Sequence, residues 1–268
     1  MSCPISAIVI TKNEEKNIQR CLTSLSFVHE VILVDSGSTD GTLKIAEHFK
    51  NVQIINADWH GYSKNKQIAI DHAKNSWILW LDADEEVDIF LKQEIINSIS
   101  TFNLQNISCY QIPRKTFFLG HWVKHSGWYP SFVIRLFHKE RCYLNNNFLH
   151  EGVVSIDGFK ILKFKNHIYH YSYHSLYQYF DKMNYYGKAG ALQLVKRNKR
   201  FFWPFIILQP LWTFFKFYIL KRGFLDGYIG VIVCMGAAFS NFIKYSNLFF
   251  LKKYGVVEVN EEKFKNDE

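Results

Sequence analysis

The chain has 268 residues, enough for one large α/β domain or for one domain with an appendage. Because 48% of the residues are hydrophobic and 17% are aromatic, the composition excludes an intrinsically disordered protein. The five cysteines are widely spaced and form no Cys-x-x-Cys pair, so they indicate neither a disulfide framework nor a zinc site. The first residues carry no basic segment before their apolar run, so we expect no signal peptide and a cytoplasmic protein.

The formal net charge of +8 is concentrated in one part of the chain. Between Lys188 and Lys253, eleven Lys or Arg residues stand against one acid, Asp226, which more than accounts for the excess of the whole chain. These basic residues are interleaved with Phe, Trp and Tyr. The combination suits either nucleic acid or an anionic membrane surface.

The first hundred residues alternate between short β-branched runs and amphipathic segments, as in a parallel sheet with crossover helices. We expect strands at 7–11, 30–35, 52–56 and 77–81, and another near 108–113. The helices are expected at 13–25 with Asn13 as N-cap, after the SGSTDG turn, at 64–74 and at 90–99. The strand at 77–81 does not alternate, so both of its faces should be buried.

The second half of the chain changes character twice. Residues 114–174 are aromatic, His-rich and strand-like, with GWYPSFVIRLF the clearest run, whereas the stretch from 175 onward is predicted to be helical. Two apolar stretches between 201 and 251 each have about the 20 residues that cross a bilayer. Their prolines, Lys216 and Asp226 favour helices in the membrane interface over spanning helices.

Acidic residues follow three of the predicted strands. Ligands of an open α/β sheet bind beyond the carboxyl ends of its strands, so the candidate site comprises residues 11–14, 35–40 and 82–86. The sequence contains neither GxGxxG nor GxxxxGK[ST], the motifs of glycine-rich phosphate loops. Acids at these positions suit hydrogen bonds to a nucleoside and a divalent cation that holds phosphates.

The acidic stretch DADEEVD at 82–88 allows three interpretations. It could be a solvated strand end with a charged helix start. An EF-hand loop fails, because Val87 stands where that loop needs Gly and Gln93 where it needs Glu. Alternatively, Asp82 and Asp84 reach one small volume and bind Mg²⁺ or Mn²⁺. We interpret the other three acids, Glu85, Glu86 and Asp88, as supporting charges or as charges at the start of the next helix.

Three motifs now resemble a known family. AIVITKNEEKNI, VILVDSGSTDGT and WILWLDADE, in this order and spacing, look like the nucleotide-sugar domain of glycosyltransferase family 2, inverting enzymes with the GT-A fold. The resemblance implies a mostly parallel sheet flanked by helices, followed here by a helical, basic and aromatic extension. It makes 1–113 the nucleotide-sugar half, 114–174 the acceptor side of the same domain and 175–268 a helical membrane-associating region.

The resemblance also implies roles for the strand-end residues. The uracil and ribose of a UDP-sugar would be contacted by Thr11, Glu14 and Asp35. Asp82 would face the ribose or the sugar, and Asp84 would bind the divalent metal, Mg or Mn, that bridges the two phosphates.

Further residues complete the predicted site. An inverting transfer is a single displacement at the anomeric carbon, so a general base must take the proton of the acceptor hydroxyl. Glu151 in LHEGV is the predicted base, and a surface strand-end Glu is the alternative. Arg135 is predicted to offset charge on the leaving UDP, although on an alternating strand it could point outward to an acid.

Two more residues are assigned by the resemblance. Many family members carry an Arg near Lys64 or Lys66, so Lys64 is expected at the donor. Some GT-A families recruit a distant His as an extra metal ligand, and His170 is the predicted one here; a packing histidine is the alternative.

The motifs GWYPSFVIRLF, FLHEGV and IYHYSYHS and the tail resemble lipopolysaccharide core glucosyltransferases that act on inner-core heptose. This implies UDP-glucose as donor, a lipopolysaccharide precursor as acceptor, and a protein peripheral on the anionic cytoplasmic face of the inner membrane, with no nucleic-acid partner. Other acceptors, such as a polyprenyl-phosphate or a capsule sugar, remain possible. A nucleotidyltransferase normally needs a glycine-rich, basic loop after the first strand to bind a triphosphate, and the segment TKNEEKN at this position is too acidic for that role. A non-catalytic nucleic-acid or membrane-binding protein leaves the strand-end acids unexplained.

Overall fold

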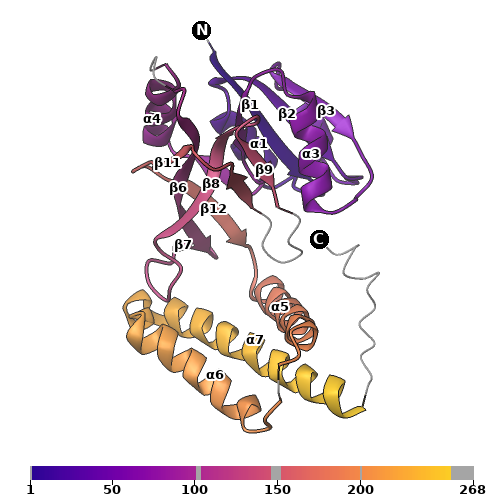
Figure 1. The fold of residues 1–268 in the computed structure, drawn as a ribbon, viewed down its shortest axis with the longest axis vertical. Helices are drawn as coiled ribbons and strands as arrows, with labels where there is room; N and C mark the ends of the chain where they lie inside the picture. Colours follow the sequence, from indigo (N-terminus) through magenta and orange to yellow (C-terminus); the bar gives the residue numbers. More distant parts are fainter. Residues whose placement is uncertain (1, 101–103, 146–151, 200, 255–268) are drawn as a thin grey trace. The chain divides into compact units, whose positions relative to one another are not determined.

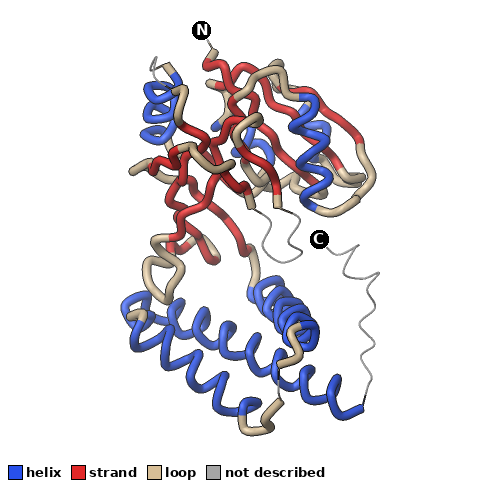
Figure 2. Tube along the Cα trace, in the orientation of Figure 1, coloured by secondary structure: helices blue, strands red, loops and turns tan. Residues whose placement is uncertain are grey.

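The structure is a computed structural model that describes residues 2–100, 104–145, 152–199 and 201–254 (Figure 1). The chain forms two compact units. Unit 1 comprises the described residues within Met1–Arg114 and Ser131–His170, and unit 2 those within Lys115–Pro130 and Tyr171–Phe264. The described part of unit 1 is built on strands, and that of unit 2 mainly on helices (Figure 2).

Four parallel strands form the first half of the sheet in unit 1. They lie in the order β3-β2-β1-β4, with bounds β1 (Cys3–Thr11), β2 (Val28–Asp35), β3 (Val52–Asn56) and β4 (Trp77–Trp80). Thr11 is in register with Asp35, and Asp35 with Asn56, so the strands end level with one another. The four predicted strands are confirmed, and their carboxyl ends share one edge of the sheet.

The second half of the sheet is mixed in direction. It continues from β4 in the order β8-β6-β12-β5, with β8 antiparallel to both β4 and β6, and β5 antiparallel to β12. Strand β11 pairs with β6, β7 pairs with the end of β6 that belongs to unit 2, and β9 and β10 form a separate pair. The bounds are β5 (Glu85–Val87), β6 (Ile107–Phe118), β7 (His121–Trp122), β8 (Ser131–His138), β9 (Cys142–Leu144), β10 (Val153–Ser155), β11 (Lys160–Lys163) and β12 (Ile168–Tyr173).

Helices cover both faces of this sheet. The helices of unit 1 are α1 (Ile18–Ser24), α2 (Thr42–Ala46), α3 (Tyr62–His72) and α4 (Ile89–Ile99). Leu79 of β4 belongs to a core that includes Leu22 of α1 and Leu91 of α4, whereas Ile78 belongs to a second core with Ile70 of α3. Strand β4 is therefore buried on both faces, as its apolar sequence predicts. The predicted α/β fold is confirmed, with a parallel first half and a mixed second half.

One local prediction was wrong. Asn13 is not a helix N-cap: α1 begins at Ile18 after Asn17, and Asn13 has a φ of 58°. Its side chain accepts a hydrogen bond from Thr39 N instead, because the loop after β1 is tied to the loop after β2. The helix predicted at 90–99 is confirmed as α4, with Asp88 at its N-cap, whereas Glu85 and Glu86 lie before it in strand β5, which pairs with β12.

The described part of unit 2 has three long helices and two short helical turns. They are α5 (Leu176–Lys196), α6 (Phe205–Phe215), the π-helical turn η1 (Lys216–Leu220), the 3₁₀ turn η2 (Gly223–Asp226) and α7 (Gly227–Tyr254). Gly236 of α7 lets Tyr179 of α5 come close, since a Cβ there would lie 2.2 Å from the tyrosine ring. Within the described residues one helical stretch, Gly223–Tyr254, is long and apolar enough to cross a membrane by length and composition, and a third of its most apolar window is buried.

Candidate active site

The ends of β1 and β2 form a polar edge. Thr11 is buried, and its Oγ1 has no hydrogen-bond partner among the described residues. Asp35 is also buried and accepts hydrogen bonds from Gly37 N at 3.0 Å and Ser38 N at 2.8 Å. Gly37 has a φ of 84°, which a residue with a side chain rarely adopts. The turn thus holds the Asp35 carboxylate in place, on the strand next to a buried Thr11 hydroxyl that has no partner among the described residues.

Glu14 lies in the loop that follows β1. Its backbone N–H donates to Thr42 Oγ1 at 2.8 Å, which anchors this loop to the loop after β2. Its carboxylate accepts a hydrogen bond from Asn17 Nδ2 at 2.7 Å. Three residues predicted to contact the UDP-sugar therefore lie at or just after the ends of neighbouring strands: Thr11, Glu14 and Asp35.

A charged centre lies beyond the end of β4. Asp82 accepts a hydrogen bond from Trp80 Nε1 at 2.9 Å through Oδ1, and one from Arg135 Nη2 through Oδ2. Arg135 is only 4% exposed, and its guanidinium carbon lies 4.4 Å from the centre of the Trp80 ring. The alternative in which Arg135 points outward is therefore wrong: β8 directs it inward, next to the predicted metal site.

Glu85 belongs to this centre, although its sequence position suggested only a supporting charge. Its side chain is fully buried, and Oε1 accepts hydrogen bonds from Arg135 Nη2 at 2.8 Å and Arg114 Nη1 at 3.3 Å. Oε2 accepts one from Asp82 N at 3.1 Å. No local signal could have found these contacts, because both arginines come from strands that follow much later in the chain.

The charges around Asp82 determine its ionisation. Desolvation favours a raised pKa for Asp82, but Arg135, Lys66 and the Trp80 hydrogen bond together hold this pKa well below its usual range. Desolvation likewise opposes the charged form of Arg135, yet Asp82 and Glu85 raise the pKa of Arg135 above its ordinary value. The centre therefore holds a carboxylate and a guanidinium in their charged forms.

Lys66, rather than Lys64, reaches the centre. Lys66 is buried on α3, and its Nζ lies 3.7 Å from the centre of the Trp80 ring and 4.9 Å from that of Tyr62. Lys64 is exposed. The two lysines lie on different sides of the helix, because positions two apart do not share a helical face.

The side chains of Asp84 and His170 are in contact, next to the paired strands β5 and β12. His170 Nε2 lies 3.1 Å from Asp84 Oδ2, and His170 is in register with Glu85 in the β5–β12 pair. A carboxylate and an imidazole are ligands that Mn²⁺ accepts. Among the described residues, no group of three or more His, Cys, Asp or Glu could hold a metal ion. A metal held by Asp84 and His170 would therefore need to take its remaining ligands from donor phosphates and water.

The predicted base, Glu151, lies outside the described residues. The residues on either side of residues 146–151 are joined by two hydrogen bonds, Asn145 N to Gly152 O at 2.9 Å and Gly152 N to Asn145 Oδ1 at 2.8 Å.

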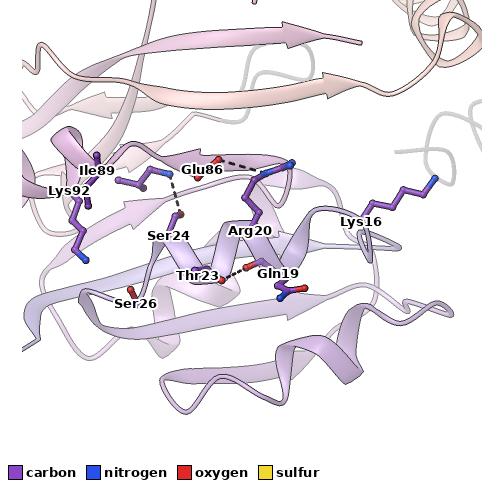
Figure 3. Close-up of a pocket in the computed structure, with 10 residues that line it drawn as sticks. Lys16, Gln19, Arg20, Thr23, Ser24, Ser26, Glu86, Ile89 and Lys92 are labelled. Carbon is purple, nitrogen blue, oxygen red and sulfur yellow. Dashed lines mark hydrogen bonds and ion pairs between the residues drawn. The ribbon is translucent and has the colours of Figure 1, made fainter. Parts of the chain in front are cut away.

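A pocket of about 510 Å³ lies elsewhere in unit 1, between α1 and the β5–α4 segment (Figure 3). Arg20 and Glu86 meet in it at 3.8 Å, and Lys16 and Lys92 extend in different directions. None of the predicted site residues lines this pocket. The strand-end cluster, where the charges converge, is therefore the better candidate site.

Comparisons with known proteins agree with the motifs. Residues 6–165 match the family model described as "Glycosyl transferase family 2". A Rickettsia felis protein named "Uncharacterized glycosyltransferase" is 34% identical over 269 residues, which cover 96% of this chain and 94% of the relative. The Rhizobium meliloti "Lipopolysaccharide core biosynthesis glycosyltransferase LpsC" is 26% identical, and the matched region covers 92% of this chain and 92% of that protein. The structure of Staphylococcus aureus TarS 1–349 in complex with UDP has 17% identity and a TM-score of 0.47, over 96% of this chain and 95% of that chain.

Proposed function

The chain belongs to glycosyltransferase family 2, and on this premise we propose that it transfers glucose from UDP-glucose to an inner-core heptose of a lipopolysaccharide precursor. The observation that carries the proposal is the convergence of Asp82, Asp84, Arg135 and His170 at the end of β4, beside the strand ends that carry Thr11 and Asp35. The similarity to LpsC, whose name states a role in lipopolysaccharide core biosynthesis, supports the acceptor class.

The nucleotide is held by the polar edge of the sheet. The carboxylates of Glu14 and Asp35 offer hydrogen-bonding groups to a uracil and a ribose, as does the Thr11 hydroxyl, which has no partner in the described part of the chain. Asp84 and His170 would hold Mg²⁺ or Mn²⁺ together with the donor phosphates, and the bound metal would neutralise charge on the diphosphate.

The transfer is a single displacement. The acceptor oxygen bonds to the anomeric carbon while the bond from that carbon to the UDP oxygen breaks, and the configuration inverts. Glu151 takes the hydroxyl proton in this proposal. Arg135 and Lys66 place positive charge near the diphosphate, where negative charge develops as UDP leaves.

Unit 2 associates with the anionic cytoplasmic surface of the inner membrane in this proposal. The helix α6 exposes five large apolar side chains at helical spacing: Ile207, Leu208, Leu211, Trp212 and Phe215. A patch of this kind suits a membrane interface. A spanning α7 is less compatible with its packing against α5, because α5 carries exposed Asp181, Lys182 and Lys188 that a bilayer core would disfavour.

A screen of UDP-sugars tests the function. UDP release is measured with and without Mn²⁺ or Mg²⁺, and with and without lipopolysaccharide from strains that make truncated cores. We expect metal-dependent release that is greatest with UDP-glucose and rises when a heptose-terminated core is added. If a polyprenyl-phosphate or a capsule oligosaccharide increased UDP release and the heptose-terminated core did not, the proposed acceptor would be wrong. Absence of release with every nucleotide-sugar would contradict the proposal.

A further inference from the structure

Glu85 is the most deeply buried acid of the charged centre. Its side chain has no exposed surface, whereas the Asp82 side chain is 39% exposed. One carboxylate oxygen accepts hydrogen bonds from Arg135 and Arg114, and the other accepts one from the backbone of Asp82. Glu85 therefore bridges the chain segment of Asp82 and the guanidinium that pairs with the Asp82 side chain.

The acids and arginines of this cluster are paired, and Lys66 adds a further positive charge near Asp82. Two acids, Asp82 and Glu85, face two arginines, Arg114 and Arg135. Buried charges of this kind persist only when each is paired and hydrogen-bonded. Loss of the charge on Glu85 would leave the two arginines with one carboxylate between them, so Arg135 would be drawn toward Asp82.

Arg135 Nη2 is shared between two different carboxylates. It donates to Asp82, which is partly exposed at the site, and to Glu85, which is enclosed. The flat guanidinium also lies over the Trp80 ring, and Nε has no hydrogen-bond partner among the described residues. If Asp82 contacted a bound nucleotide-sugar instead, Glu85 would still provide Arg135 with a hydrogen-bonded counter-ion.

We propose that Glu85 is a positioning residue: it holds Arg135 where the guanidinium meets the diphosphate of the donor and the departing UDP. This inference rests on the proposed binding of a UDP-sugar. It assigns Glu85 no contact with substrate, so Glu85 acts through the groups that it holds, and the proposal assigns its effect to Arg135 rather than to Arg114 or the Asp82 backbone. Ligands without a β-phosphate should be insensitive to it.

Calorimetric binding of UDP and UMP in the presence of Mn²⁺ tests this role. In Glu85→Gln we expect UDP affinity to fall about tenfold, the effect of one hydrogen bond to a charged group, while UMP affinity stays within about twofold. Glu86→Gln is the matched control, because Glu86 neighbours Glu85 in β5 and pairs with Arg20 in the separate pocket. This variant should bind both nucleotides as the unaltered chain does.

A double-mutant cycle shows whether the effect passes through Arg135. Arg135→Lys combined with Glu85→Gln should bind UDP no more weakly than Arg135→Lys alone, because the second change acts on a contact already lost. With UDP-glucose as substrate, Glu85→Gln should lower kcat about tenfold or more and leave KM within about threefold, because the lost contact strengthens as UDP departs.

The outcomes separate the two hypotheses. If the unaltered chain does not bind UDP, the proposed function fails, and the role of Glu85 fails with it. If it binds UDP and Glu85→Gln binds equally well, or loses UDP and UMP alike, only the role of Glu85 is overturned. Should Glu85→Gln fail to fold, Glu85→Asp keeps the charge but retracts it by one methylene. A folded Asp variant with unchanged UDP affinity would then overturn the role.

Discussion

The two units treat charged and apolar side chains in opposite ways. Unit 1 buries charged residues such as Lys66, Glu85 and Arg135 and pairs them around one site. Unit 2 exposes large apolar residues such as Leu211 and Trp212 along α6. Both arrangements are unfavourable for the free energy of folding. Charged groups lose their hydration when they are buried, and apolar side chains that stay in water contribute no hydrophobic stabilisation. This difference underlies the proposal that unit 1 binds a nucleotide-sugar and unit 2 a membrane surface.

The acid in the basic region of unit 2 sharpens this contrast. Asp226 is turned inward and accepts hydrogen bonds from the backbone N–H groups of Lys124 and His125 and from His125 Nδ1. Its side chain is only 5% exposed. The segment from α6 to α7 therefore combines exposed apolar residues with exposed cations such as Lys216 and Lys221, and no other acid occurs between Lys188 and Lys253.

The largest effect should come from removing the metal-binding acid of unit 1. Asp84→Asn is expected to lower the rate of metal-dependent UDP release about 10³-fold, because it removes a charged ligand next to the diphosphate. Titration of activity with Mn²⁺ measures the loss. Asp71→Asn on the exposed surface of α3 is the control and should retain full activity. Wild-type activity in Asp84→Asn would remove this residue from the site.

A smaller loss is expected when Arg135 keeps its charge but loses its shape. Arg135→Lys should lower kcat about 10²-fold, because an ammonium cannot contact Asp82 and Glu85 while lying flat on Trp80. Steady-state kinetics with UDP-glucose measure the change. Arg141→Lys is a matched control in unit 1, since Arg141 bonds the carbonyl groups of Leu104 and Ile107 and belongs to no site. An equal loss in both variants would mean that Arg135 acts through stability alone.

Replacing exposed apolar residues of α6 tests whether unit 2 uses them to bind a membrane surface. Leu211→Ser with Trp212→Ser should weaken binding to liposomes that contain anionic lipid at least tenfold, because two large apolar side chains no longer leave water. Flotation measures binding. Ile89→Ser with Phe90→Ser is the control in unit 1, where these residues are 65% and 68% exposed. The control should bind liposomes as the unaltered chain does.

The same assay separates surface binding from spanning. Raising the salt concentration should weaken liposome binding, because cations near an anionic surface contribute about 1 kcal/mol each at low ionic strength. Association that resists salt and requires detergent would contradict a peripheral position and favour a spanning α7.

The smallest effect concerns a buried acid of unit 1 outside the site. Glu30 accepts hydrogen bonds from Ser6 Oγ at 2.6 Å and Lys74 N at 2.7 Å. Desolvation opposes its ionisation, but these bonds and Lys74 lower the pKa of Glu30 below its ordinary value. Glu30→Gln should therefore lower the free energy of unfolding by about 1 kcal/mol at neutral pH.

The difference in unfolding free energy between the unaltered chain and Glu30→Gln should depend on pH. Because the folded-state pKa of Glu30 lies below the unfolded one, its contribution is present above the unfolded pKa, about 4.3, and is lost as pH falls through the folded-state pKa. Denaturant unfolding should thus show the two proteins converge in acid. Glu47→Gln on the surface is the control and should change stability little at any pH. A difference that persists undiminished in acid would contradict the role of ionised Glu30.

The predictable part of the site follows from strand periodicity. An apolar run ends at a polar residue where the strand leaves the core, so Thr11, Asp35 and Asp82 could be placed at one sheet edge from the sequence alone. The family resemblance predicts Asp84 and His170 as metal ligands, and in the structure their side chains are in contact. Their roles as metal ligands, and that of Glu151 as base, stay predictions.

The sequence by itself determined the α/β order of the elements, the strand-end acids and the basic, aromatic character of the C-terminal half. These properties depend on neighbours in the chain, through the strand and helix periods and through local composition. Only the tertiary structure decided that Glu85 joins Arg114 and Arg135, that Lys66 rather than Lys64 reaches Trp80, and that Asn13 ties two loops together. Each of these contacts joins segments far apart in the chain, and a buried charge is stabilised by whichever partner the packing brings near it.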